Sequence, residues 1–166
     1  MSSLFDRLDD RKSMEFADKI GDVFKSLPNL PSGIVDFLVK VAPYFALLGA
    51  IMYVIVTPLG VLGTLFSLLS LNPMVVLMMV VATGLMVVQG VLLFMAYKPL
   101  KDRQPRGWML MFWSEVLYAV SIVFDILGGS GWVGSVLGLL IGFYILYQMR
   151  RAYNGAAEVI AKTVKE

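Results

Sequence analysis

Residues 41–97 read VAPYFALLGAIMYVIVTPLGVLGTLFSLLSLNPMVVLMMVVATGLMVVQGVLLFMAY, and this stretch decides the fold because it contains no Asp, Glu, Lys or Arg. A second stretch, from Trp108 to Met149, carries only two charged residues, Glu115 and Asp125. A helix in a water-soluble domain needs a polar face toward the solvent, and these stretches provide none. The sequence therefore predicts an all-α integral membrane protein.

The two stretches hold four helices of membrane-spanning length. A spanning helix needs about 20 predominantly apolar residues, and turn-forming residues such as Asn72-Pro73 and Gly128-Gly129 separate the runs. We predict a four-transmembrane-helix bundle, preceded by an N-terminal amphipathic helix. The transmembrane domain covers residues 32–149, with spans at about 34–57, 73–97, 107–127 and 132–149, and a tail follows over residues 150–166.

The connection at residues 58–72 has two interpretations. Pro58 and Gly60 interrupt the apolar pattern, and residues 59–71 are too few to cross a bilayer alone at about 1.5 Å per residue. Either the first span continues past a proline kink, or residues 59–71 form a separate short helix at the membrane edge. A broken or kinked connection is slightly favoured.

Residues 1–31 form a polar arm. From Phe16 onward its apolar residues have the spacing of an amphipathic helix, and acidic residues slightly outnumber basic ones. A helix that adheres to anionic lipid is rich in Lys and Arg, so we expect this arm to dock on its own bundle, on a neighbouring subunit or on a partner. Shallow insertion into the membrane interface is the alternative.

Charge asymmetry predicts the orientation. The connections at residues 58–72 and 128–131 are uncharged, whereas basic residues gather at one end of the predicted bundle. By the positive-inside rule that end is cytoplasmic. We expect both termini, the arm and the tail to be cytoplasmic, in a bacterial cytoplasmic membrane, and we expect no cleaved signal peptide. The basic residues set the topology or contact lipid head groups: Lys98, Lys101, Arg103, Arg106, Arg150 and Arg151.

The composition excludes several kinds of chemistry. Histidine and cysteine are both absent, which removes the commonest metal and haem ligands, disulfides and nucleophilic catalysis of the Ser-His-Asp or Cys-His type. No phosphate-binding, zinc or nucleic-acid motif is present. We therefore expect no catalytic residue, no metal, no cofactor and no nucleic-acid partner.

The third span carries the best candidates for an ion or proton pathway. Ser114, Tyr118, Ser121 and Asp125 share one helical face, with Glu115 beside it. Counting from the helix ends places Gln89 at the depth of Glu115, which predicts a hydrogen bond between them. Glu115 would titrate, oriented by Gln89, with Asp125 near the outer mouth. The competing interpretation is structural, since polar groups between spans often only hold helices together.

The fourth span carries Gly134, Gly138 and Gly142 at intervals of four residues. Small residues at this spacing let another backbone approach closely. Packing inside the monomer, most simply against the third span, is the commoner use of such a groove. The more specific hypothesis is that this groove forms an interface between copies of the chain.

These features favour a non-enzymatic protein that works by helix packing, as an accessory subunit, a scaffold or a self-associating unit. Its partners would be the lipid bilayer and a homo-oligomer or larger membrane complex. The alternative is an oligomeric ion or proton channel, or a small transporter, that uses Glu115 and the polar face of the third span.

Overall fold

The computed structural model describes the backbone of residues 11–24, 26–127 and 133–163, and this part of the chain is helical with no strand. Side chains are not described at 11, 12, 125, 127 and 154–163. The elements are α2 (Arg11–Phe24), α3 (Ser32–Ser67), the 3₁₀ turn η2 (Leu68–Ser70), α4 (Pro73–Lys101), α5 (Pro105–Leu127) and α6 (Val133–Thr163).

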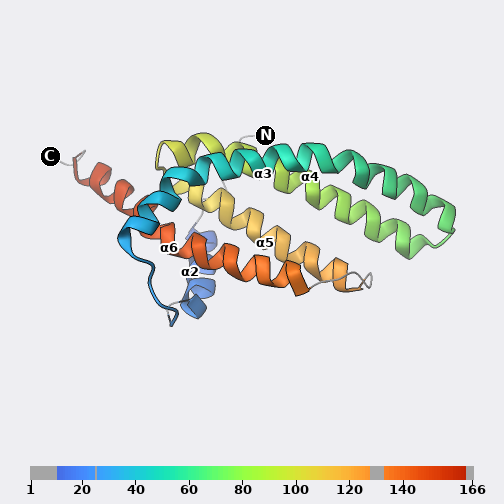
Figure 1. Ribbon diagram of the computed structural model, residues 1–166, viewed down its shortest axis with the longest axis horizontal. Coiled ribbons are helices and arrows are strands. Elements are labelled where there is room, and N and C mark those ends of the chain that lie inside the picture. Colours follow the sequence, from blue (N-terminus) through green and yellow to red (C-terminus); the bar gives the residue numbers. More distant parts are fainter. Residues whose placement is uncertain (1–10, 25, 128–132, 164–166) are drawn as a thin grey trace.

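Four of these helices are long and apolar enough to cross a membrane: Ser32–Ser70, Pro73–Lys101, Pro105–Phe124 and Val133–Tyr153. Helices that follow one another in the chain pack side by side, α3 on α4, α4 on α5 and α5 on α6 (Figure 1). The predicted fold class, a four-transmembrane-helix bundle with an amphipathic N-terminal helix, is confirmed.

The first long helix does not stop at Pro58. α3 continues to Ser67, so the end predicted at residue 57 is too early, and the continuous helix is the one found of the two alternatives. Proline removes one backbone donor, yet a loop in hydrocarbon would leave many more backbone groups unpaired. Beside the proline, the Thr57 hydroxyl donates to the Tyr53 carbonyl at 2.6 Å, so this side chain brings no unpaired polar group into the membrane.

Polar contacts join α3 to α4 in the half of this hairpin that lies toward the connecting turn η2. The hydroxyls of Thr64 and Thr83 lie 3.0 Å apart across the two helices. Beyond η2, Leu71 has the positive φ of 54° that turns the chain. Asn72 then caps α4 by accepting a hydrogen bond from the Met74 amide at 3.0 Å, and Pro73 is the first helical residue, as predicted. The hairpin extends beyond α5 and α6 at this end (Figure 1).

The buried core lies toward the opposite end. Phe112 and Tyr153 are fully buried there, and Trp108 is 2% exposed. The Trp108 indole N–H donates to the Leu146 carbonyl at 2.7 Å, which ties α5 to α6. Aromatic rings gather around this bond from α2, α5 and α6: Phe16, Phe24, Trp108, Phe112, Trp113, Phe143 and Tyr147.

Helix α2 docks on the protein's own bundle, across the side of α5 and α6 (Figure 1). Phe16 stacks on Trp113 with ring centroids 6.0 Å apart, and Phe24 stacks on Tyr147 at 5.4 Å. Gly21 permits this approach, because a Cβ there would lie 2.7 Å from the Tyr147 ring. Of the alternatives for the arm, docking on its own bundle is the one that the structure shows for α2.

The corner between α4 and α5 depends on Gly107. A Cβ at this position would lie 2.5 Å from the backbone nitrogen of Leu100, which cannot move aside as a flexible side chain would. We expect Gly107→Ala to lower the free energy of unfolding by about 1–3 kcal/mol, the usual cost of overpacking. Unfolding in detergent, followed by loss of helical circular dichroism, would measure it.

Gly84→Ala is the matched control, because an added Cβ at Gly84 meets nothing within 4 Å. Alanine is the better helix former by about 0.5–1 kcal/mol, so this variant should be as stable as the wild type or more so. Equal destabilisation by both substitutions would contradict the assignment of Gly107 to a close contact.

Candidate functional site

A buried amide joins three of the four long helices. Gln89 on α4 is 1% exposed. Its Oε1 accepts a hydrogen bond from the Tyr53 hydroxyl of α3 at 2.5 Å, and its Nε2 donates to the Ser121 hydroxyl of α5 at 3.0 Å. Ser121 in turn donates to the Leu117 carbonyl at 3.1 Å. We call Tyr53, Gln89 and Ser121 the glutamine network.

The predicted hydrogen bond between Gln89 and Glu115 is wrong, because Gln89 bonds to Tyr53 and Ser121 instead. The error comes from the register. Helix α4 runs on to Lys101, past its expected end at Tyr97, and Gly107 packs against Pro99 and Leu100. Gln89 therefore meets Ser121, six residues further along α5 than Glu115, and Glu115 faces α6 instead.

The Glu115 carboxylate packs against α6. A Cβ at Gly142 would stand 2.9 Å from Glu115 Oε1 and 3.0 Å from Oε2, so the absence of a side chain at Gly142 makes room for the carboxylate. Four residues away, Gly138 stands under the Tyr118 hydroxyl, 4.0 Å from the place of an added Cβ. Two of the three glycines in the predicted α6 motif, Gly138 and Gly142, thus receive polar side chains of α5.

The remaining predicted residues are spread along the bundle. An added Cβ at Gly134 would meet nothing within 4 Å. Asp125 lies near the end of α5, and its side chain is outside the described residues. Neither of the two cavities described below is lined by Glu115, Gln89 or Tyr118, whereas Tyr53 of the glutamine network lines the second. The described residues hold no His, Cys, Asp or Glu cluster suited to a metal ion.

The predicted basic residues gather at one end, on α4, the 102–104 connection, α5 and α6. Arg150 has a further role that its position in the sequence does not reveal. It forms an ion pair with Asp18 of α2 at 2.5 Å, and its guanidinium lies 5.0 Å from the centre of a Trp108 ring. Because cations bind favourably over an indole face, Arg150 links α2 to the aromatic core.

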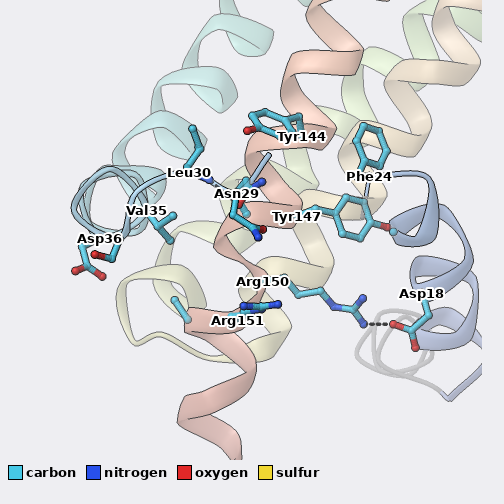
Figure 2. Close-up of a pocket in the computed structure, with 14 residues that line it drawn as sticks. Asp18, Phe24, Asn29, Leu30, Val35, Asp36, Tyr144, Tyr147, Arg150 and Arg151 are labelled. Carbon is cyan, nitrogen blue, oxygen red and sulfur yellow. Dashed lines mark hydrogen bonds and ion pairs between the residues drawn. The ribbon is translucent and has the colours of Figure 1, made fainter. Parts of the chain in front are cut away.

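A cavity of about 630 Å³ opens beside this ion pair, between α2, the segment before α3, the first turns of α3, and α6 (Figure 2). We call it the interfacial cavity. Side chains of α6 hold the segment before α3 in place beside the cavity. The Tyr144 hydroxyl donates to the Pro28 carbonyl at 2.7 Å. The Gln148 amide group also donates to the Pro28 carbonyl and accepts from the Leu30 amide. Sequence reasoning missed this cavity, because its walls come from segments more than a hundred residues apart.

A second cavity of about 530 Å³ is a groove on the outer side of α3 and α4, which we call the α3–α4 groove. Small residues stand among its lining, including Ala50 and Gly90, with Tyr53 and Thr57 between the two helices. Apolar side chains form the rest: Leu47, Ile51, Val54, Pro58, Met86, Val87, Val91 and Phe94.

Comparison with protein-family models, with curated proteins and with solved structures gives no match for this chain. Its function is therefore inferred from its own residues.

The glutamine network predicts a specific loss on Tyr53→Phe. This change removes the donor to Gln89 and leaves a buried amide oxygen unpaired. Hydrogen bonds between membrane helices contribute about 0.6 kcal/mol on average and up to about 1.7 kcal/mol, so we expect a loss of unfolding free energy within that range. Reversible unfolding in mixed micelles is the measurement.

Tyr44→Phe serves as the control, since Tyr44 is on the same helix and is 59% exposed. It should leave stability unchanged. A Tyr53→Phe variant as stable as Tyr44→Phe would show that the network does not hold α3 to α4.

Proposed function

We propose that this protein is a small, non-enzymatic integral membrane protein that acts through helix packing, as a self-associating scaffold or accessory unit. The observation that carries this proposal is the α3–α4 groove, an apolar hollow with small residues among its lining, on the outer face of the bundle. Dispersion contacts drive helix association in lipid, and an apolar hollow of this kind can receive side chains from another copy of the chain.

The internal use of the polar residues supports the same proposal. The candidate residues of an ion or proton pathway contact neighbouring helices. Gln89 forms hydrogen bonds to α3 and α5, and the Glu115 carboxylate fits over Gly142 of α6. Gly138 and Gly142 face α5 as well, so the outer face of α3 and α4 is a better candidate for a seam between copies than these two glycines of α6.

The proposed orientation places the end that bears Lys101 and Arg103 in the cytoplasm of a bacterial cell, following the positive-inside rule. Both termini would then be cytoplasmic. The membrane would surround α3 and α4, whose exposed side chains include Phe45, Val54 and Phe94.

Native mass spectrometry of the protein from nanodiscs tests the proposal. We expect a discrete homo-oligomer. Val54→Trp should shift it toward monomer, since Val54 is 72% exposed and lines the groove, which the larger ring would fill. Leu77→Trp is the control, because Leu77 is 57% exposed on α4 and does not line the groove. Recovery of monomer alone, with cross-linking in native membranes also giving monomer, would overturn self-association.

An ion or proton channel is the second candidate, and Glu115 is the residue that favours it. A carboxylate partway along a membrane helix is a functional-site hypothesis by default. If the protein conducts protons through this group, Glu115→Gln should reduce proton flux into liposomes by at least about tenfold, since an amide does not carry the proton that a relay passes on. Unchanged flux in that variant would remove this candidate. Asp102→Asn is the control for loss of a carboxylate elsewhere, because Asp102 is exposed and lines neither cavity.

A further inference from the structure

We propose that the interfacial cavity binds the head group of a phospholipid that carries both a phosphate and a primary ammonium. The site lies within one copy of the chain, so it does not depend on the proposed self-association. The argument rests on the position of the cavity, on its charges and on its apolar wall.

The cavity lies at the level where the apolar stretches end. The apolar run of α6 closes at Met149, and Arg150 and Arg151 follow directly. The uncharged stretch of α3 begins at Val41, a little more than one turn after Asp36. Both Arg151 and Asp36 line the cavity. Lipid phosphates and ammonium groups occupy this boundary, so a head group reaches the site without leaving the membrane.

Four charged residues line the cavity, and two of them bind each other. Arg150 turns toward α2 and pairs with Asp18, whereas Arg151 lies nearer the middle of the cavity and Asp36 on the far wall, on α3 (Figure 2). Within the described part of the chain, Arg151 and Asp36 are both exposed and neither forms an ion pair. The cavity therefore presents one cation and one anion, which matches a zwitterion better than a simple anion.

The surrounding groups fit the same ligand. A guanidinium binds phosphate oxygens through two N–H donors. The first turn of α3 begins at Ser32 beside the cavity and has no side-chain cap, so the positive end of the helix dipole also favours the phosphate. A primary ammonium, unlike a quaternary one, donates hydrogen bonds to a carboxylate such as Asp36.

The apolar side of the cavity can contact the glycerol and acyl-chain region of a lipid, next to its head group. Phe24, Leu30, Val35, Tyr144 and Ala152 line the cavity together with the charged residues. A volume of about 630 Å³ is within the usual range of small-molecule sites. Free head group and intact lipid share the phosphate and ammonium, but only the lipid uses this wall and the adjoining hydrocarbon.

The test is lipid binding by the full-length protein in detergent, titrated with dioleoyl phosphatidylethanolamine or dioleoyl phosphatidylglycerol and followed by native mass spectrometry. We expect the ethanolamine lipid to bind more tightly to the wild type. Arg151→Gln should weaken both lipids by about two- to fivefold, the range for one ion pair at an exposed site. Asp36→Asn should weaken only the ethanolamine lipid, because the glycerol head group has no ammonium.

Lys101→Gln and Asp102→Asn are the matched controls. Both residues are exposed near the same end of the bundle and neither lines the cavity. They should leave both affinities unchanged. Thermal unfolding of all four variants should match the wild type, which separates loss of binding from loss of fold.

Two results would overturn the proposal. One is an Asp36→Asn variant that weakens both lipids equally or neither, since the carboxylate would then not select the ammonium. The other is full displacement of the bound lipid by soluble glycerophosphoethanolamine at matched concentration, which would assign the site to a free head group rather than to a membrane lipid.

Discussion

Hydrocarbon offers no hydrogen-bond partner, and most of this structure follows from that constraint. Backbone groups that lie in hydrocarbon must be satisfied within the protein, so α3 stays helical even across Pro58. The same constraint governs the side chains. The hydroxyls of Thr57 and Thr64 donate to backbone carbonyls of their own helix. The Gln89 amide group accepts a hydrogen bond from Tyr53 and donates one to Ser121.

Aromatic packing holds the helices together at the basic end, as hydrogen bonds between side chains do in the middle of the bundle. The helices α5 and α6 meet α2 through stacked and edge-on rings, and the polar edges of these rings are also used: Trp108 donates to Leu146, and Tyr147 donates to Ala17. Arg150 closes the arrangement by facing Trp108 on one side and Asp18 on the other. The amphipathic helix α2 is held here by specific contacts with its own bundle.

The sequence predicted the elements well and their contacts poorly, for physical reasons. Apolar runs set the number of spans, and Asn72-Pro73 marked the start of α4 correctly. Whether the first span continues past Pro58 stayed open in the sequence, because a proline that ends a helix in water is tolerated within a membrane helix. The partner of Gln89 was missed because counting from the helix ends gives neither the exact register nor the neighbour that each side chain of α5 faces, and Glu115 faces α6. The interfacial cavity has no local signal, since Asp18, Asp36 and Arg151 meet only through the fold.

The overhang of the α3–α4 hairpin has a consequence for the surrounding lipid. Helix α3 has 36 residues and α5 has 23, which correspond to about 54 Å and 35 Å of helix. At the distal tip Phe66, Leu69 and Leu71 are 69%, 77% and 91% exposed. A bilayer of uniform thickness cannot match both flanks of such a molecule at once. Either the long hairpin tilts, or the acyl chains beside it stretch while those beside α5 and α6 compress. One side of the protein is therefore taller than the other along the membrane normal, and its tilt angle should change with the thickness of the bilayer.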